Sequence, residues 1–551
     1  MGEMVRGRAV PHRPHSVLTN RYSTMTMNCQ FKIAMGAALA AVPALQAGTD
    51  VWFTPLTQSA PVVASNAIEE LSAPWVAPEG IQQINWVSLA EVENAILSPG
   101  QSVGRAAGQG TSAAMFDMLA CHPAGTHLFI PHESPVGAGV TRYDIYANKA
   151  ELLFAGDLGG LNGDWSNDWG AFDPCRWTPH GTLFLAEEWA GEGRVIEVLN
   201  PMADLSVETT QIRELDAIPN VSHEGINFSV KYSNTIYFID EYNSGSIYKI
   251  VLKDSRDFTQ GGQVFVLSVD GFLGSGGVPE NNWNEGPNAT AVREGAATWV
   301  PLTDANGVAL PGITDPFRNG PTNDPRSNND TMGGRPAADD AGGTPFGRPE
   351  DMVVSRLANG NEVLYVTVTS ESRVLSIEIL EGVTRIKKKG RKPRVVPSGK
   401  PTGKAIVRTL CSEADTPKNV GYPGTTATLG SPDNLALDAA GNIYVIEDNP
   451  NSSSTGGDIW FARDRNNDGV AESLDHFLSL RVAGSEATGM IFNPAVPTEF
   501  HVCVQHPTST DLNAVPDGFG DAVWTFNLSQ VPNQDFVRSL NRGRFRTLTN
   551  Q

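Results

Sequence analysis

The stretch GTHLFIPHE (residues 125–133) decides the fold, because its pattern recurs along the chain. A turn residue opens it, a short run of aliphatic and aromatic residues follows, and a polar or acidic end closes it. The further copies are GTLFLAEE (181–188), NTIYFIDE (234–241), NEVLYVTVTSES (361–372), GNIYVIED (441–448) and TEFHVCVQH (498–506). The first three copies end at Glu133, Glu187 and Asp240, which are 54 and 53 residues apart. A repeat of about 50 residues with several short strands is typical of propeller blades.

These copies predict an all-β fold, a single β-propeller of six blades with long loop insertions and a few short helices. Two insertions widen the spacing. Residues 303–345 are rich in Gly, Pro, Asn and Asp, and we expect a long loop there. Residues 385–404 carry nine basic residues and no acid. For this second insertion we expect a solvated hairpin between blades, with polyanion binding as the alternative.

The composition narrows the classes of partner. Of 551 residues only 18% are charged, and 55 Gly with 37 Pro exceed the average share, which suits many turns between short strands. The net charge is −21, so we expect cations rather than nucleic acid as partners. Cys121, Cys175, Cys411 and Cys503 follow the leader, too few for a disulfide scaffold, and the sequence does not assign pairs among them.

Residues 1–47 have the features of a signal peptide. Basic residues precede the apolar run IAMGAALAAVPAL, and Ala44-Leu45-Gln46-Ala47 is an A-x-A-like cleavage site. The run is too short to cross a bilayer, and no later run is longer, so no transmembrane segment is expected. A start at Met25 or Met27 would give a more ordinary leader. We therefore expect residues 48–551 to form the propeller domain of a secreted or periplasmic protein.

A residue whose side chain could bind a metal ion precedes each strand end by 12 to 21 positions. The series is Asp117, Cys175, Glu224, Glu350, Asp433 and Glu486. Inner strands of propeller blades start at the same end of the central channel, so these side chains are expected to converge. Clustered carboxylates suit Ca²⁺ or Mg²⁺, and a thiolate among them suits a metal such as iron. The alternative is that individual acids cap turns.

Arg348 adds a possible anion site, because it lies two residues before Glu350 and thus on the same face of an expected strand. A guanidinium beside bound metal ions matches phosphate, and metal ions that neutralise charge and activate an oxygen nucleophile are what phosphoester hydrolysis requires. The alternative is a salt bridge from Arg348 to Glu350 or Asp351.

A second metal candidate is the segment from Asp464 to Asp475. Asp464, Asn466 and Asp468 stand at positions 1, 3 and 5 of a calcium-loop pattern, Gly469 at position 6 and Asp475 at position 12. A hairpin turn that uses Asn and Asp is the alternative.

Together, the ordered motifs GTHLFIPHE, DPCRWTPHGTLFLAEE, HEGIN, GRPED, SPDNLALD, GNIYVIED, GSEATGM and VQHP resemble the PhoX-type alkaline phosphatases over residues 110–510. The resemblance implies an exported phosphomonoesterase that carries Ca²⁺ and Fe³⁺. As partners we expect small phosphomonoester substrates and inorganic phosphate, and we expect the protein to be a monomer. It implies that Cys175 and Glu224 hold iron and that Arg348 engages the substrate phosphate. The further metal ligands that it implies are Glu187, Glu188, Glu350, Asp433 and Glu486, and Glu133 is an additional candidate.

Three departures from the family pattern stand out. The segment around Cys175 is shorter and poorer in Gly, His180 stands where the family has Trp, and the leader has no Arg-Arg pair. Two other functions therefore stay open at this point: a calcium-dependent propeller hydrolase of the lactonase kind, and a non-catalytic scaffold stabilised by calcium. Iron together with calcium would favour the phosphatase.

Overall fold

The computed structural model describes residues 51–63, 74–88, 115–189, 192–276, 282–317, 331–386, 394–448, 457–482, 484–505 and 521–547. The chain divides into two units, Met1–Ala44 and Leu45–Gln551, and every described residue belongs to the second. The predicted signal peptide, residues 1–47, lies outside the described residues. No helix among the described residues is long and apolar enough to cross a membrane.

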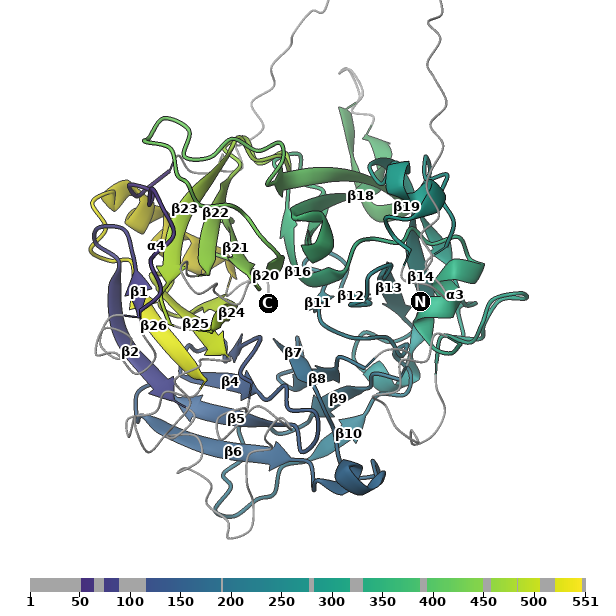
Figure 1. Ribbon diagram of the computed structural model, residues 1–551. Helices are drawn as coiled ribbons and strands as arrows, with labels where there is room; N and C mark the ends of the chain where they lie inside the picture. The colour runs from purple at the N-terminus through teal and green to yellow at the C-terminus, as the bar shows by residue number, and fades with distance from the viewer. Residues whose placement is uncertain are drawn as a thin grey trace, which may run out of the picture. The chain divides into compact units, whose positions relative to one another are not determined.

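The second unit is built from antiparallel sheets in a propeller-like arrangement (Figure 1). Two four-stranded sheets follow the chain order. The first contains β3 (Ala120–Cys121), β4 (His127–Pro131), β5 (Gly139–Asp144) and β6 (Lys149–Ala155). The second contains β7 (Phe172–Trp177), β8 (Leu183–Glu187), β9 (Val195–Val198) and β10 (Ile212–Glu214).

A nine-stranded sheet follows in the chain. Its first half contains β11 (Ile226–Phe228), β12 (Thr235–Ile239), β13 (Ile247–Leu252), β14 (Gly262–Val269) and β15 (Gly295–Pro301). Its second half contains β16 (Pro349–Arg356), β17 (Glu362–Val368), β18 (Arg373–Ile386) and β19 (Arg394–Ser412). The outer strands β15 and β19 pair with each other, from Gly295 opposite Val407 to Thr298 opposite Lys404, and thereby join the halves.

The last two sheets combine both ends of the unit. One contains β20 (Pro432–Leu437), β21 (Ile443–Glu447), β22 (Asp458–Arg463), β23 (Ser473–Leu480) and the early strand β1 (Trp75–Val76). The other contains β24 (Glu486–Phe492), β25 (Glu499–Gln505), β26 (Ala522–Asn527) and the early strand β2 (Gln82–Ser88). β1 pairs with β23 and β2 pairs with β26, so the N-terminal and C-terminal parts of the unit are hydrogen-bonded within the same two sheets.

Six strands line the middle of the unit, namely β3, β7, β11, β16, β20 and β24 (Figure 1). Each contacts the next one in this order, and β24 contacts β3, so they form a closed ring. The apolar cores lie between neighbouring sheets. One core, for example, joins Phe129 of β4 to Phe172 of β7 and Leu185 of β8. This packing holds the starts of the six strands close together.

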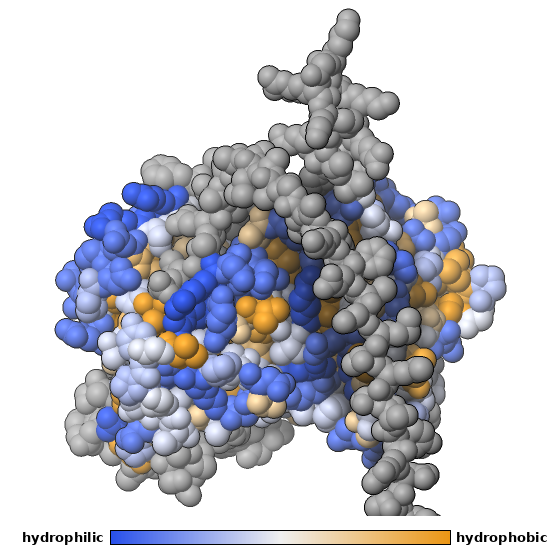
Figure 2. Space-filling model, turned by 90° about the horizontal axis from the view of Figure 1, so that it is seen from above, coloured by the Kyte–Doolittle hydropathy of each residue, from blue (hydrophilic) through white to orange (hydrophobic). Residues whose placement is uncertain are grey.

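Few helices complete the described fold. The longest is α4 (Gln534–Thr547), and the others are α3 (Gly334–Asp340) and the short η1 (Gly159–Asn162), η2 (Phe258–Gln260), η3 (Gly286–Thr290) and η4 (Thr369–Glu371). On the face seen in Figure 2, hydrophilic residues predominate and apolar ones form separate groups.

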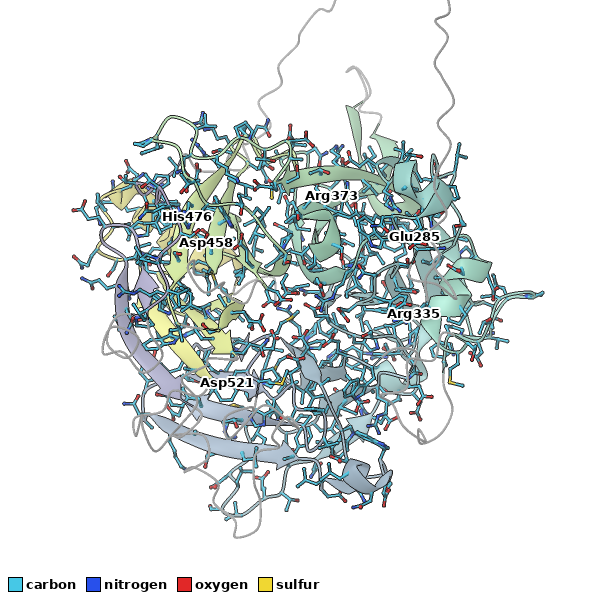
Figure 3. All side chains as sticks on the ribbon, viewed as in Figure 1. Glu285, Arg335, Arg373, Asp458, His476 and Asp521 are labelled. Atoms are coloured by element: carbon cyan, nitrogen blue, oxygen red, sulfur yellow. The ribbon has the colours of Figure 1, made fainter. Side chains whose placement is uncertain are left out.

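Both insertions are partly described. Within 303–345, helix α3 packs Ala337 and Ala338 into the core and fixes Arg335 to Asp240 of the strand end, so this segment buries more than its composition suggests (Figure 3). Within 385–404, β18 and β19 pair as far as Ile386 opposite Arg394, so this insertion extends a hairpin within the nine-stranded sheet rather than one between blades. Residues 318–330 and 387–393 lie outside the described residues.

Candidate metal centre

The inner strands begin with a repeated backbone turn that positions a carboxylate. In four copies a residue with a side chain adopts the left-handed conformation, with φ between 44° and 60°. These residues are Met115, Ala171, Arg348 and Ser431. Two residues after each stands an acid: Asp117, Asp173, Glu350 and Asp433, respectively. A left-handed conformation costs about 1–2 kcal/mol, so the surroundings must hold it in place.

A backbone hydrogen bond holds each turn. The N–H that follows the second strand of the sheet donates to the carbonyl of the left-handed residue, as from Glu188 to Ala171 and from Asp448 to Ser431, both at 2.9 Å. Glu133 donates in the same way to Met115, and Thr369 to Arg348. A matching bond from Glu241 to Ser222, at 2.8 Å, identifies a fifth copy, in which the carboxylate is Glu224.

After the turn, the register between the inner strand and the second strand shifts. The register shifts between Phe172 and Cys175, between Pro349 and Met352, and between Pro432 and Leu435. A bulge of this kind changes the direction of a side chain, and here it contains Asp173, Glu350 or Asp433. In β24 the corresponding shift follows Thr488, so Gly489 takes the equivalent place and the acid of this strand, Glu486, comes earlier.

The second strand of several sheets adds another carboxylate. The residue whose N–H holds the turn is itself acidic in four sheets: Glu133, Glu188, Glu241 and Asp448. We call these four, together with Asp117, Asp173, Glu224, Glu350, Asp433 and Glu486, the central carboxylates. Within this set, ligand oxygens of Glu224, Glu350 and Asp433 all lie within 4.8 Å of one another.

Burial and mutual repulsion raise the pKa values of eight of the central carboxylates. Burial is the largest cause for Glu350 and Asp117, and the pKa of each rises to about 7. The pKa values of six others are raised well above their ordinary values for the same two reasons: Glu133, Asp173, Glu188, Glu224, Asp433 and Glu486. Bound cations would relieve this repulsion and let the groups ionise.

Arg348 is the cation that reaches into the central carboxylates among the described residues. Its Nε is 3.1 Å from Glu350 Oε1 and also pairs with Glu241, while Nη1 is 3.4 Å from Asp448 Oδ2. Burial lowers the pKa of its guanidinium, but the surrounding carboxylates more than compensate and raise it. The side chain is 34% exposed, and Nη2 makes no hydrogen bond to the described residues.

The structure corrects one detail of the Arg348 prediction. The residue lies in the turn before β16 rather than on a strand face with Glu350. It nevertheless reaches Glu350, so the salt bridge that the sequence left open is present. A phosphate-binding role for Arg348 stays a prediction.

The side chain of Glu187 does not lie among the central carboxylates. Its two carboxylate oxygens accept hydrogen bonds from Arg194 Nε and Nη2, both at 2.6 Å, and Oε1 also accepts one from the N–H of Gly170 at 3.1 Å. Asp240 is bound by Arg335, and Glu447 by Trp460 Nε1 and the Gly430 N–H. Glu187, Asp240 and Glu447 are each followed directly by a second acid. In each of these pairs the first acid supports the turn, whereas the second acid, such as Glu188, is one of the central carboxylates.

Cys175 does not lie among the central carboxylates. It is fully buried in the apolar core between the first two sheets, and its nearest hydrogen-bond acceptor is Phe129 O, 3.8 Å from Sγ. Burial raises the pKa of the thiol.

Asp464 to Glu472 form a hairpin turn between β22 and β23, and Asp475 lies within β23. Asp464 Oδ2 accepts a hydrogen bond from the Gly469 N–H at 2.7 Å, and Asn466 and Asp468 likewise accept backbone N–H bonds. Asp475 is instead buried against Arg463, with Nε 2.8 Å from Oδ2. These contacts are those of the hairpin alternative, which we favour here over a calcium loop.

Sequence reasoning did not select Asp173, Glu241 or Asp448, and it named Asp117 only as a member of the series. A signal was available in the four motifs FDML (116–119), FDPC (172–175), PEDM (349–352) and PDNL (432–435). In each, an acid is the second residue and an apolar residue is the fourth, which places Asp173 and not Cys175 in line with Glu350 and Asp433.

The oxygen atoms of the site that could bind a metal ion fit hard cations. Asp173 Oδ1 and Gln505 Oε1 are buried beside the central carboxylates and accept no hydrogen bond from the described residues. Carboxylate and amide oxygens are the ligands of Ca²⁺, so the central carboxylates fit calcium. A thiolate-bound iron is not supported, because the Cys175 thiol lies in an apolar core.

Fold and site together define a propeller-like protein with an acidic centre suited to metal ions and one arginine beside it. The sequence profile of the family described as Alkaline phosphatase PhoX matches residues 174–508 of this chain. The match spans more than half of the chain, which therefore belongs to the PhoX alkaline phosphatase family. The protein is accordingly a phosphomonoesterase, and its substrates are phosphate esters.

The solved structure of one PhoX protein supports the propeller-like fold, and two other solved structures are less similar. Pseudomonas fluorescens PhoX in complex with vanadate, a transition state analogue, is 15% identical, with a TM-score of 0.53, over 86% of this chain and 98% of that one. Regucalcin from Agrobacterium tumefaciens, a calcium-binding protein, is 10% identical with a TM-score of 0.32, over 77% of this chain and 92% of that one. Aldose sugar dehydrogenase from Streptomyces coelicolor is 12% identical with a TM-score of 0.33, over 82% and 99%. No curated protein matches the chain.

Proposed function

We propose that this phosphatase depends on metal ions held by the central carboxylates and that Arg348 binds the phosphoryl group of the substrate. The observation that carries the proposal is the imbalance of charge at the centre. Ten buried or half-buried carboxylates gather around one guanidinium, and the site therefore needs cations from solution.

Calcium is the cation that we propose. The residues that would hold it include Glu224, Glu350 and Asp433, whose oxygens are already close enough to share an ion. When bound, such cations neutralise the negative charge of a phosphate ester and stabilise the charge that develops during hydrolysis. The same carboxylates would otherwise repel an anionic substrate.

Arg348 is suited to orient that substrate. Its carboxylate contacts through Nε and Nη1 fix the direction of the guanidinium, and Nη2 remains available on a side chain that is one-third exposed. A planar guanidinium matches two oxygens of a phosphate, which a lysine cannot do.

The finer points of the architecture belong to the same proposal. We regard the nine-stranded sheet as two blades joined at their outer edges, which gives a six-bladed propeller with one inner strand per blade. We further propose that residues 1–47 direct export to the periplasm or the medium and that residues 48–551 act as a monomer on small phosphomonoesters.

A chromogenic phosphomonoester, p-nitrophenyl phosphate, tests the proposal. The purified chain should hydrolyse it, and Glu350→Gln and Asp433→Asn should abolish hydrolysis while the protein remains folded. Asp164→Asn is the control, because Asp164 is an exposed carboxylate in a surface turn. Undiminished turnover in both central variants would show that the central carboxylates are not the active site.

A further inference from the structure

The start of β7 offers two candidate metal ligands, Asp173 and Cys175, and the strand register distinguishes them. Phe172 pairs with Glu187 and Cys175 with Leu185. In β16, Pro349 pairs with Val368 and Met352 with Val366, and in β20, Pro432 pairs with Glu447 and Leu435 with Val445. The spacing is the same in all three strands. Cys175 therefore corresponds to Met352 and Leu435, and Asp173 corresponds to Glu350 and Asp433.

The position of Cys175 is apolar in every sheet. The equivalent residues are Leu119, Ile226, Met352, Leu435 and Ile491, and each belongs to or packs on an apolar core. Cys175 packs in the same way against Phe129, Leu183 and Leu185. A buried free cysteine behaves as a small hydrophobic residue, which is the role that this position requires.

Asp173, in contrast, lies with the central carboxylates. Its side chain is 3% exposed and lies close enough to the carboxylates of Asp117, Glu133 and Asp433 for them to repel it. Its Oδ1 accepts no hydrogen bond from the described residues. A buried carboxylate oxygen without a donor is costly unless a cation supplies the missing partner.

We infer that Asp173, and not Cys175, is the metal ligand contributed by β7, so that oxygen atoms alone bind the metal ions of this phosphatase. The inference rests on the proposed metal dependence of the site. It departs from the thiolate-bound iron that family resemblance implies, and it predicts a preference for hard cations, calcium first.

Metal content distinguishes the two candidate ligands without reference to activity. Elemental analysis, calcium titration and the visible absorption spectrum are to be measured for wild type, Asp173→Asn and Cys175→Ala. We expect wild type and Cys175→Ala to hold the same metals and to show no thiolate-to-iron absorption band. Asp173→Asn should bind calcium about ten-fold more weakly or worse.

Cys411→Ala is the matched control, because Cys411 is also a fully buried free cysteine in an apolar core. Should Cys175→Ala fail to fold, Cys175→Val retains the apolar volume and serves in its place. The inference is overturned if iron and its thiolate band are present in wild type and disappear in the Cys175 variant while Asp173→Asn retains its metals. A wild-type protein that binds no metal would instead overturn the metal dependence of the proposed function, and this inference with it.

Discussion

Replacement of Arg348 by alanine separates substrate binding from metal binding. In the wild type this guanidinium lies against Glu241, Glu350 and Asp448, and its Nη2 makes no hydrogen bond to the described residues. If it binds the phosphoryl group, Arg348→Ala removes at least one charge-assisted hydrogen bond, worth about 1.5–3 kcal/mol. That loss corresponds to an increase of about 10- to 150-fold in the inhibition constant of inorganic phosphate.

The stability of the variant should change little when calcium is present. Arg348 is one-third exposed, so its ion pairs are partly screened, and bound calcium would compensate the carboxylates that lose their partner. Arg348→Lys should recover only part of the phosphate affinity, because an ammonium lacks the planar pair of donors. Arg256→Ala is the control, since Arg256 is 82% exposed and pairs with Asp254 on the surface.

The assay is p-nitrophenyl phosphate hydrolysis over a range of inorganic phosphate concentrations, with metal content measured on the same samples. We expect a higher KM, weaker phosphate inhibition and unchanged metal content for Arg348→Ala. Wild-type inhibition by phosphate in this variant would refute the assignment of Arg348 to substrate binding, and loss of metal would show that it acts mainly to assemble the site.

Three further predictions concern other residues and conditions. Glu187→Gln should lower the free energy of unfolding by about 3–5 kcal/mol, measured by urea denaturation, because it leaves Arg194 buried without its partner. The metal content per folded chain should not change. A loss of metal with intact stability would contradict the structural role of Glu187. In excess chelator, stability should fall as pH rises, because Glu350 and Asp117 have pKa values of about 7 in the folded chain against ordinary values of 4.5 and 3.8. The folded state then binds more protons than the unfolded state between about pH 4 and 7, so Tm should be higher at pH 5 than at pH 8. Saturating calcium should remove or reverse this trend. A Tm that rises with pH in chelator would contradict the burial of these acids. Asp464→Asn should leave calcium binding and activity unchanged, because Asp464 accepts backbone hydrogen bonds in a surface hairpin; the loss of one bound calcium in a titration would instead establish a second site.

The repeat in the sequence was sufficient to predict an all-β, propeller-like fold. The strand ends at Glu187 and Glu447 are found where the repeat put them, and β12 ends one residue before Asp240, because period-2 alternation and turn residues are local signals. The pairing of β15 with β19 was not predictable, since it joins residues more than a hundred positions apart in the chain. Such contacts depend on how whole sheets pack.

The sequence also indicated part of the carboxylate cluster, whereas the metal-binding and catalytic roles of its residues stay predictions. Glu224, Glu350 and Asp433 were identified as a series and do come together. Glu187 and Glu188 are neighbours in sequence, and which of them faces the centre depends on the strand pleat, which the sequence does not specify. The choice of Cys175 over Asp173 followed from the chemical prominence of a thiol, whereas the bulge that directs Asp173 inward becomes visible only in the strand register.

The most direct test of metal dependence is the phosphomonoesterase activity of the chain after exhaustive chelation, followed by calcium titration. We predict that chelation abolishes hydrolysis of p-nitrophenyl phosphate and lowers Tm, and that calcium restores both over the same concentration range, because one set of carboxylates serves stability and catalysis. Full activity and an unchanged Tm in protein shown by elemental analysis to be free of metal would contradict the account.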